Sequence, residues 1–279
     1  MRGRVLAVAG SDSGGGAGIQ ADIKTVTALG GYALTALTAL TAQNTQKVAG
    51  VLGVPPDFVR LQMETVLSDL GADAIKTGML HTAGVIEAVA DVLERMAPDI
   101  ALVVDPVMVA KGGARLLDSA AVNILKERLL LRATVMTPNV PEAEALTGLR
   151  LTVVKEVVHA AETLLTLGAQ AVFITGGHID QSQIQDVLAT PEGIEIFESP
   201  RIATPHTHGT GCTLASAIAT GLAQGSTLRE AILRARAYVW EAIRTAPGFG
   251  HGHGPINHAH TVGGHPNDLQ NGSDDDDEA

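Results

Sequence analysis

The sequence predicts an α/β fold of three layers, in which helices cover both faces of a mostly parallel central sheet. Over the first two hundred residues, short apolar runs alternate with segments whose apolar residues recur every three or four positions. This alternation is typical of strand–helix–strand units, which build parallel sheets covered on both faces. No linker interrupts the pattern, so we expect one domain over residues 1–262. Residues 263–279 are polar and acidic, and we expect a disordered tail there.

Composition and charge exclude several classes of protein. Of the 279 residues, 46% are hydrophobic but only 3% are aromatic, so the expected core is aliphatic. The formal net charge of −11 argues against a nucleic-acid partner. The single cysteine excludes an internal disulfide. No apolar run is long enough for a membrane span or a signal peptide, so we expect no membrane association and a cytoplasmic location.

The first unit is a strand, a glycine-rich loop and a helix, over residues 4–9, 10–18 and 19–29. The loop fits the loose dinucleotide-binding pattern, but the next strand ends in Gln43 rather than in the acid that would bind a ribose. A P-loop is excluded because no Gly-Lys-Ser/Thr occurs in the sequence. Asp22 falls within the first turns of the helix, where a solvated acid is an ordinary feature.

Further strands and helices alternate along the chain. Residues 32–42 repeat Leu-Thr-Ala, and we interpret them as a strand because threonine is frequent there. The helix opened by Pro55 and Pro56 is expected to turn Phe58, Leu61, Val66 and Leu70 inward. The other expected elements are strands over 72–75, 100–104, 133–136 and 171–174, an antiparallel pair over 185–188 and 193–198, and helices capped by Thr82, Asn139 and Thr227 or covering 119–131 and 153–167.

A glycine turn, residues 208–212, precedes another helix and is the clearest chemical feature. Leu214, Ile218 and Leu222 recur every fourth residue, so the helix begins directly after the glycines. Its unpaired N–H groups and its dipole would bind an anion such as a phosphate. Cys212 lies in the first turn, where the same field favours a thiolate. The alternative is an ordinary turn followed by a small buried cysteine.

Polar residues follow several of the predicted strands, so they should gather at one edge of the sheet, where such folds bind ligands. Asp105, Asn139 and Glu142 offer oxygen ligands suited to a magnesium–nucleotide complex. For Asn139 and Glu142, helix capping is the alternative, because their spacing is that of a capping box. A histidine group near the C-terminus (His251, His253, His258 and His260) lacks a spacing that would fix a metal, so a structural or loop role is expected.

Six stretches together resemble one enzyme family. They are AGSDSGGGAGIQAD at 9–22, AQNT at 42–45, KTGML at 76–80, DPVM at 105–108, TPNVPEA at 137–143 and HGTGCTL at 208–214. They are similar to hydroxymethylpyrimidine/phosphomethylpyrimidine kinases of thiamine biosynthesis, which belong to the ribokinase-like superfamily. The resemblance runs from Val5 to His258. It implies ATP as phosphate donor, Mg²⁺, a homodimer, and phosphorylation of 4-amino-5-hydroxymethyl-2-methylpyrimidine and then of its monophosphate.

The resemblance also implies roles for individual residues. Gln43 would read the pyrimidine edge, and Cys212 falls where sugar kinases of the superfamily carry an aspartate base. Thr175 stands where family members often have lysine. The remaining implied residues are Gly10, Asp22, Met79 and Val107 around the ring, Gly209, Thr210 and Gly211 in the anion hole, Asn139, Thr175, Gly177 and Lys111 toward ATP, and Asp105 and Glu142 toward the metal.

Two other functions stay open on the sequence. A pyridoxine or pyridoxal kinase of the same superfamily is the nearest alternative, because both substrates are flat, nitrogen-containing rings that bear a hydroxymethyl group. A non-catalytic nucleotide-binding module is the alternative from another class, and it would need no base at Cys212. A dinucleotide oxidoreductase is disfavoured by the missing ribose acid.

Overall fold

Nine strands form one sheet in the computed structural model, which describes residues 2–109, 113, 117, 119–179 and 182–263. The strand order within these residues is β3-β2-β1-β4-β5-β6-β7-β8-β9. Strands β2, β1, β4, β5, β6 and β7 run parallel, whereas β3, β8 and β9 each pair antiparallel. The strands are β1 (Arg4–Asp12), β2 (Tyr32–Gln43), β3 (Val48–Gly53), β4 (Ala74–Thr77), β5 (Ala101–Val104), β6 (Val135–Met136), β7 (Val172–Ile174), β8 (Gln183–Thr190) and β9 (Gly193–Pro200).

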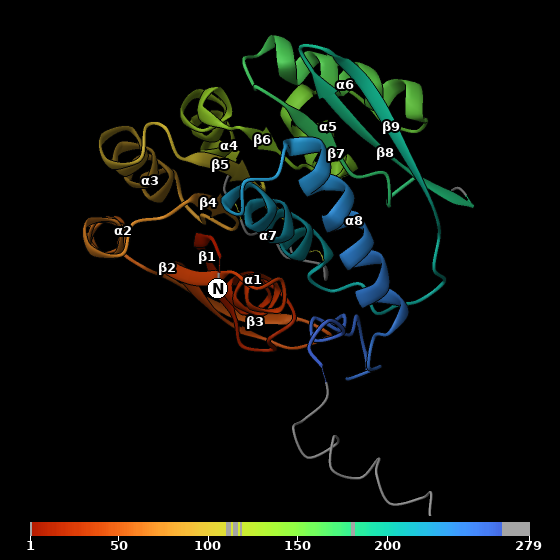
Figure 1. Ribbon diagram of the computed structural model, residues 1–279, viewed down its shortest axis with the longest axis horizontal. Coiled ribbons are helices and arrows are strands. Elements are labelled where there is room, and N and C mark those ends of the chain that lie inside the picture. Colours follow the sequence, from red (N-terminus) through yellow and green to blue (C-terminus); the bar gives the residue numbers. More distant parts are fainter. Residues whose placement is uncertain (1, 110–112, 114–116, 118, 180–181, 264–279) are drawn as a thin grey trace, which may run out of the picture.

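Helices cover both faces of this sheet, so the predicted three-layer arrangement is confirmed (Figure 1). Helices α1, α7 and α8 pack on one face, and α2 to α6 pack on the other. The helices are α1 (Gly18–Ala28), α2 (Pro56–Asp69), α3 (Ala83–Met96), α4 (Ser119–Arg128), α5 (Val140–Thr147), α6 (Val154–Thr166), α7 (Thr210–Ala223) and α8 (Leu228–Arg244). Among the described residues, no helix is long and apolar enough to cross a membrane.

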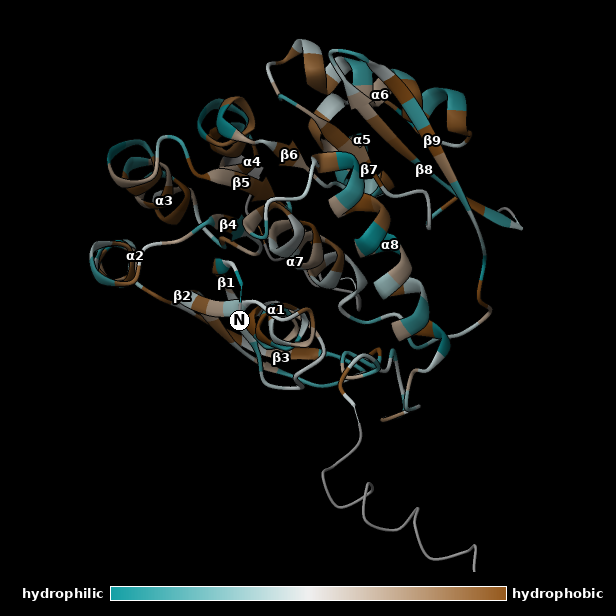
Figure 2. Ribbon diagram, viewed as in Figure 1, coloured by the Kyte–Doolittle hydropathy of each residue, from teal (hydrophilic) through white to brown (hydrophobic). Residues whose placement is uncertain are grey.

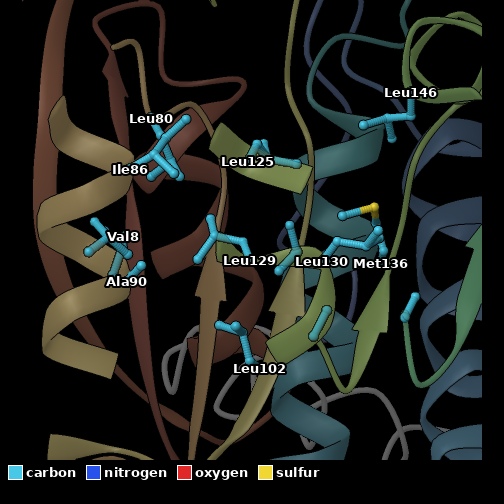
Figure 3. Close-up of a cluster of buried hydrophobic side chains, with 14 of the residues drawn as sticks. Val8, Leu80, Ile86, Ala90, Leu102, Leu125, Leu129, Leu130, Met136 and Leu146 are labelled. Carbon is cyan, nitrogen blue, oxygen red and sulfur yellow. The ribbon is translucent and has the colours of Figure 1, made fainter. Parts of the chain in front are cut away.

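Two large clusters, one on each face of the sheet, make up most of the core that the described residues form, and a small third cluster joins Ala39 and Met79. The larger lies between the sheet and helices α2 to α6, and its aliphatic side chains meet in Figure 3. Helix α3 turns its hydrophobic side toward the sheet and its hydrophilic side outward (Figure 2). Helix α7 differs, because every residue from Thr213 to Gly221 is buried between the sheet and its neighbours. The helix that carries the glycine turn is therefore fixed on all sides.

Two local expectations differ from the structure. Strand β3 was not predicted: it is an edge strand whose side chains are mostly exposed, so it shows no apolar alternation. Of the inward face expected for α2, Val66 packs against the core as predicted, but Phe58, Leu61 and Leu70 are wrong, because they are 55%, 53% and 43% exposed. Val59 and Met63 pack inward instead. Lys111 and residues 264–279 of the expected tail lie outside the described residues.

Candidate active site

A cleft of about 650 Å³ opens at the carboxyl ends of the parallel strands. The structure brings together at this cleft most of the residues that the sequence singled out, although they come from different strands. Those lining it are Gly10, Gln43, Met79, Asp105, Val107, Asn139, Glu142, Thr175, Gly209, Thr210, Gly211 and Cys212. The convergence follows from the topology, because parallel strands deliver their ends to one edge.

The glycine turn has the geometry of an anion site. Helix α7 begins at Thr210, and Gly209 precedes it with φ +85°, a left-handed conformation that favours glycine. A side chain at residue 209 would also overlap the carbonyl oxygen of Gly16. The first N–H groups of a helix have no acceptor within it, and no side chain caps this end of α7. The residues that carry these N–H groups line the cleft, so the groups would donate hydrogen bonds to a phosphate bound there.

Cys212 is a protonated thiol in this setting, which corrects the expectation of a favoured thiolate. Desolvation raises its pKa to about 12, and the attraction of Lys76 does not offset it, since Asp105 and Asp22 act in the opposite sense. Its thiol is hydrogen-bonded to the Asp105 carboxylate. The helix field that the sequence suggested is therefore outweighed by burial and by nearby carboxylates.

Beneath the cleft lies a buried ionic cluster that the sequence did not reveal. Lys76 Nζ is 2.8 Å from Asp22 Oδ1 and 3.9 Å from Asp105 Oδ2. Burial alone would lower the pKa of Lys76, but the surrounding acids raise it above its ordinary value. Ser216 donates a second hydrogen bond of 2.7 Å to Asp22 Oδ1. The cluster joins α1, β4 and α7.

Asp22 therefore departs from both of its expected positions. It is not solvated on the polar side of α1, because it has no exposed surface. It also does not line the cleft, so the structure does not place it around the substrate ring. Its carboxylate is engaged by Lys76 and Ser216 instead. Asp22 is better described as a support for the floor of the cleft.

Glu142 caps α5 and also faces the cleft. Its Oε2 accepts from the Asn139 N–H over 2.9 Å, and its own N–H donates to Asn139 Oδ1 over 3.0 Å, so the capping box is present. Burial and the nearby Asp105 raise the pKa of Glu142 to about 8, and burial raises that of Asp105 to about 6. The Glu142 shift favours a cation beside the two carboxylates, because a cation would relieve the repulsion that Asp105 exerts on Glu142.

Asp12 and His208 form a second pair that the sequence did not single out. Asp12 Oδ2 is 2.8 Å from His208 Nε2, although the two residues are 196 positions apart. Gln43 Nε2 lies 3.3 Å from the same histidine nitrogen. No local pattern relates the two loops, so only the fold discloses this contact. Through His208, Gln43, which is expected to bind the substrate, contacts the turn that is expected to bind phosphate.

Other predicted residues lie apart from the site or serve the structure. Gly177 is exposed, does not line the cleft, and its carbonyl accepts from Arg201. His258 Nε2 is bonded to Thr213 Oγ1 over 2.9 Å, and His260 Nε2 to the Tyr238 carbonyl over 3.0 Å. His253 lines the cleft. His258 and His260 thus make structural contacts, as expected, whereas His253 belongs to the wall of the cleft.

Comparisons with known proteins agree with this geometry. The family model for phosphomethylpyrimidine kinase matches residues 12–257. A bifunctional thiamine biosynthesis protein of Geobacter sulfurreducens is 56% identical over 257 residues, which are 92% of this chain and 52% of that protein. A hydroxymethylpyrimidine/phosphomethylpyrimidine kinase of Bacillus subtilis is 46% identical over 256 residues, 91% of this chain and 94% of that protein.

The solved structures confirm the expected fold. An ADP complex of Bacillus subtilis pyridoxal kinase matches with a TM-score of 0.87 and 39% sequence identity. The match covers 93% of this chain and 98% of that one. The chain spans about half the length of the Geobacter relative and nearly all of the two Bacillus proteins.

Proposed function

We propose that this chain, which belongs to the phosphomethylpyrimidine kinase family, phosphorylates 4-amino-5-hydroxymethyl-2-methylpyrimidine with ATP and then phosphorylates the resulting monophosphate. One observation carries the proposal: a single cleft is lined by the start of α7 and by the amide of Gln43. The helix start suits a phosphate, because its N–H donors are unpaired. The amide suits an aminopyrimidine edge, because it offers a donor and an acceptor together.

Asp105 and Glu142 would hold Mg²⁺ beside the phosphates. Their fit to a cation rests on two buried carboxylates with raised pKa values and on Asp105 Oδ2, a buried atom without a hydrogen-bond partner. The described residues contain no group of three or more ligating side chains, but Mg²⁺ keeps several waters and needs few protein oxygens. When bound, it would neutralise charge on the transferred phosphoryl group.

Cys212 is the candidate to receive the proton of the substrate hydroxyl. Since its thiol is protonated, it accepts a proton only as it passes its own to a neighbour, and Asp105 is hydrogen-bonded to it. The net result is one proton moved from the substrate oxygen to Asp105, while the new O–P bond forms, the bond between the γ-phosphorus and the bridging oxygen breaks, and ADP leaves. Because phosphoryl transfer depends mainly on positioning and charge stabilisation, this transfer belongs late in the reaction.

A product assay tests the proposal directly. The chain is incubated with ATP, Mg²⁺ and the pyrimidine alcohol, and ³¹P NMR follows the monophosphate and then the diphosphate. We expect the monophosphate to rise and then fall as the diphosphate accumulates. ATP binding without either product would indicate a nucleotide-binding module and would reject the proposal.

Pyridoxal is the second substrate to test, since the solved pyridoxal kinase matches the whole domain. The pyridoxal ring lacks an exocyclic amine, so the Gln43 amide would lose one partner. We expect kcat/KM for pyridoxal to be lower than for the pyrimidine alcohol. The reverse order would make this chain a pyridoxal kinase.

The predicted homodimer is also proposed, and the edge of the sheet supports it. Leu40 of β2 and Leu52 of β3 are paired across the strands, and they are 43% and 68% exposed. Association would remove this apolar surface from water. Sedimentation velocity on wild type and Leu52→Glu tests it, and we expect the charged variant to shift toward monomer.

The cytoplasmic location stays a prediction.

A further inference from the structure

The Gln43 amide by itself cannot distinguish an aminopyrimidine from its oxo counterpart. The amino form presents an N–H donor beside a ring-nitrogen acceptor, whereas the 4-oxo form presents an oxygen acceptor beside a ring N–H donor. A half-turn of the terminal amide exchanges its donor and acceptor and matches either pattern. Discrimination therefore requires neighbours that hold the amide in one orientation.

His208 is such a neighbour, and Asp12 determines which of its atoms carries a proton. The Asp12 carboxylate accepts backbone N–H groups from Gly14 over 2.8 Å, Gly16 over 3.0 Å and Ala17 over 2.8 Å. Although burial acts to raise the pKa of Asp12, its bonds to His208 and Ala17 lower it, so it is ionised and only accepts. His208 Nε2, 2.8 Å away, must then carry the proton, and because a protonated ring nitrogen has no lone pair, it faces Gln43 Nε2, 3.3 Å away, only as a donor that it shares with Asp12.

Thr41 is the second neighbour. Its hydroxyl has one proton, which it donates to the Ser11 carbonyl over 2.9 Å. The hydroxyl oxygen also lies 3.3 Å from Gln43 Oε1, but with its proton on the Ser11 carbonyl it has only a lone pair to offer there. With Gln43 Nε2 beside His208 and Oε1 beside Thr41, two donors would meet at one end of the amide and two acceptors at the other. A half-turn of the amide satisfies both contacts.

We propose that His208 and Thr41 lock the Gln43 amide with Oε1 toward His208 and Nε2 toward Thr41, and that this lock selects 4-aminopyrimidines over 4-oxopyrimidines. The inference rests on the proposed function, because it assumes that Gln43 reads the substrate. One lone pair of Oε1 and one N–H of Nε2 are left over. These fit the amino group and the adjacent ring nitrogen of the substrate.

The lock is rigid because its histidine is packed. His208 is only 8% exposed, and a side chain at Gly16 would overlap its ring. Its backbone N–H donates to the Gly254 carbonyl over 3.1 Å. The amide therefore meets a donor whose position is fixed before substrate arrives, which is the condition for a selective site.

Thr41→Val and Thr41→Ser test the lock as a matched pair. The readout is the ratio of kcat/KM for the pyrimidine alcohol to kcat/KM for 5-hydroxymethyl-2-methylpyrimidin-4(3H)-one. Val is nearly isosteric but cannot accept a hydrogen bond, so we expect the ratio to fall about tenfold or more, as for one lost polar contact. Ser keeps the hydroxyl, so the ratio should stay within about threefold of wild type. A general packing defect would lower both substrates together and leave the ratio unchanged.

The amide orientation is also measurable without any substrate. In the wild-type protein, nuclear Overhauser contacts from the Gln43 Nε2 protons should reach the Thr41 methyl group rather than the His208 Hε1 proton. Contacts to His208 Hε1 would overturn the lock, and so would an unchanged substrate ratio in Thr41→Val. If the wild type failed to phosphorylate the pyrimidine alcohol, the proposed function would fail while this measurement still decided the orientation.

Discussion

Lys76 Nζ donates to Asp22 Oδ1 over 2.8 Å, and neither side chain has any exposed surface. A buried ion pair of this kind costs desolvation on both sides, so it is weak evidence for stability by itself. Its position indicates a structural role, because Ser216 of α7 donates a hydrogen bond to the same Asp22 oxygen. The pair fixes α1, β4 and α7 to one another directly below the turn expected to bind phosphate.

Removing Lys76 should be costly. Lys76→Met leaves the Asp22 and Asp105 carboxylates without their cation, and we expect a loss of about 3–5 kcal/mol in the free energy of unfolding. Urea denaturation followed by circular dichroism measures it. Lys155→Met, at an exposed lysine, is the control and should change stability by less than about 0.5 kcal/mol. Adding Asp22→Asn should recover part of the loss; a single variant as stable as wild type would contradict the account.

Gln43→Leu should raise KM for the pyrimidine about tenfold or more while KM for ATP stays unchanged. The reason is that leucine removes both hydrogen-bonding atoms at the substrate edge, where a polar contact contributes about 1–3 kcal/mol. Steady-state kinetics with each substrate varied in turn separates the two constants. Equal effects on both KM values would assign Gln43 to the general shape of the cleft.

Cys212→Ala should slow the first phosphorylation far more than the second. The alcohol must lose a proton to become a nucleophile, whereas a phosphate monoester has a second pKa near 6 and is already ionised at neutral pH. We expect kcat for the alcohol to fall by about two to four powers of ten. Single-turnover assays that start from the alcohol and from the monophosphate make the comparison. Equal losses in both steps would indicate that Cys212 acts through packing.

Glu142→Gln should weaken the response to Mg²⁺. The amide retains the capping geometry but carries no charge, so activity should fall and recover partly as Mg²⁺ is raised. Glu230→Gln is the matched control, because Glu230 occupies the same capping position in α8 and does not line the cleft. If Glu142→Gln left the Mg²⁺ dependence unchanged and altered stability as the control does, Glu142 would be a helix cap and not a metal ligand.

His258 should make the protein less stable in mild acid. Burial, with Lys24 and His208 nearby, lowers its pKa from 6.5 to about 4. Below pH 6.5 the His258 side chain is protonated in the unfolded chain but stays neutral in the folded protein. The free energy of unfolding that is present at pH 7 is therefore lost progressively down to pH 4. The loss approaches ~3 kcal/mol. Urea midpoints at pH 7 and pH 5 should differ less in His258→Gln than in wild type or in the exposed control His159→Gln.

The fold was largely predictable because most parallel strands are short apolar runs and most covering helices show an apolar period. Strand β3 was not, since an exposed edge strand has no buried face to leave a pattern. At the site, the residues that follow strands were predictable from topology. The Lys76–Asp22 and Asp12–His208 pairs were not, because contacts between distant segments have no local signal. Nor was the protonated Cys212, whose pKa depends on desolvation and on carboxylates from two other elements.

Because Gly209 packs closely against Gly16, the turn expected to bind phosphate is complete only once these two distant segments have come together. The first strand and its loop leave the ribosome early, but the turn that completes the cleft lies 196 residues later, counted from Asp12 to His208. Contacts over such separations form late in folding, since a long chain segment must first be ordered. A nascent chain that ends before residue 208 therefore has no phosphate turn. Nucleotide binding during refolding would report completion of the whole domain rather than of its first half.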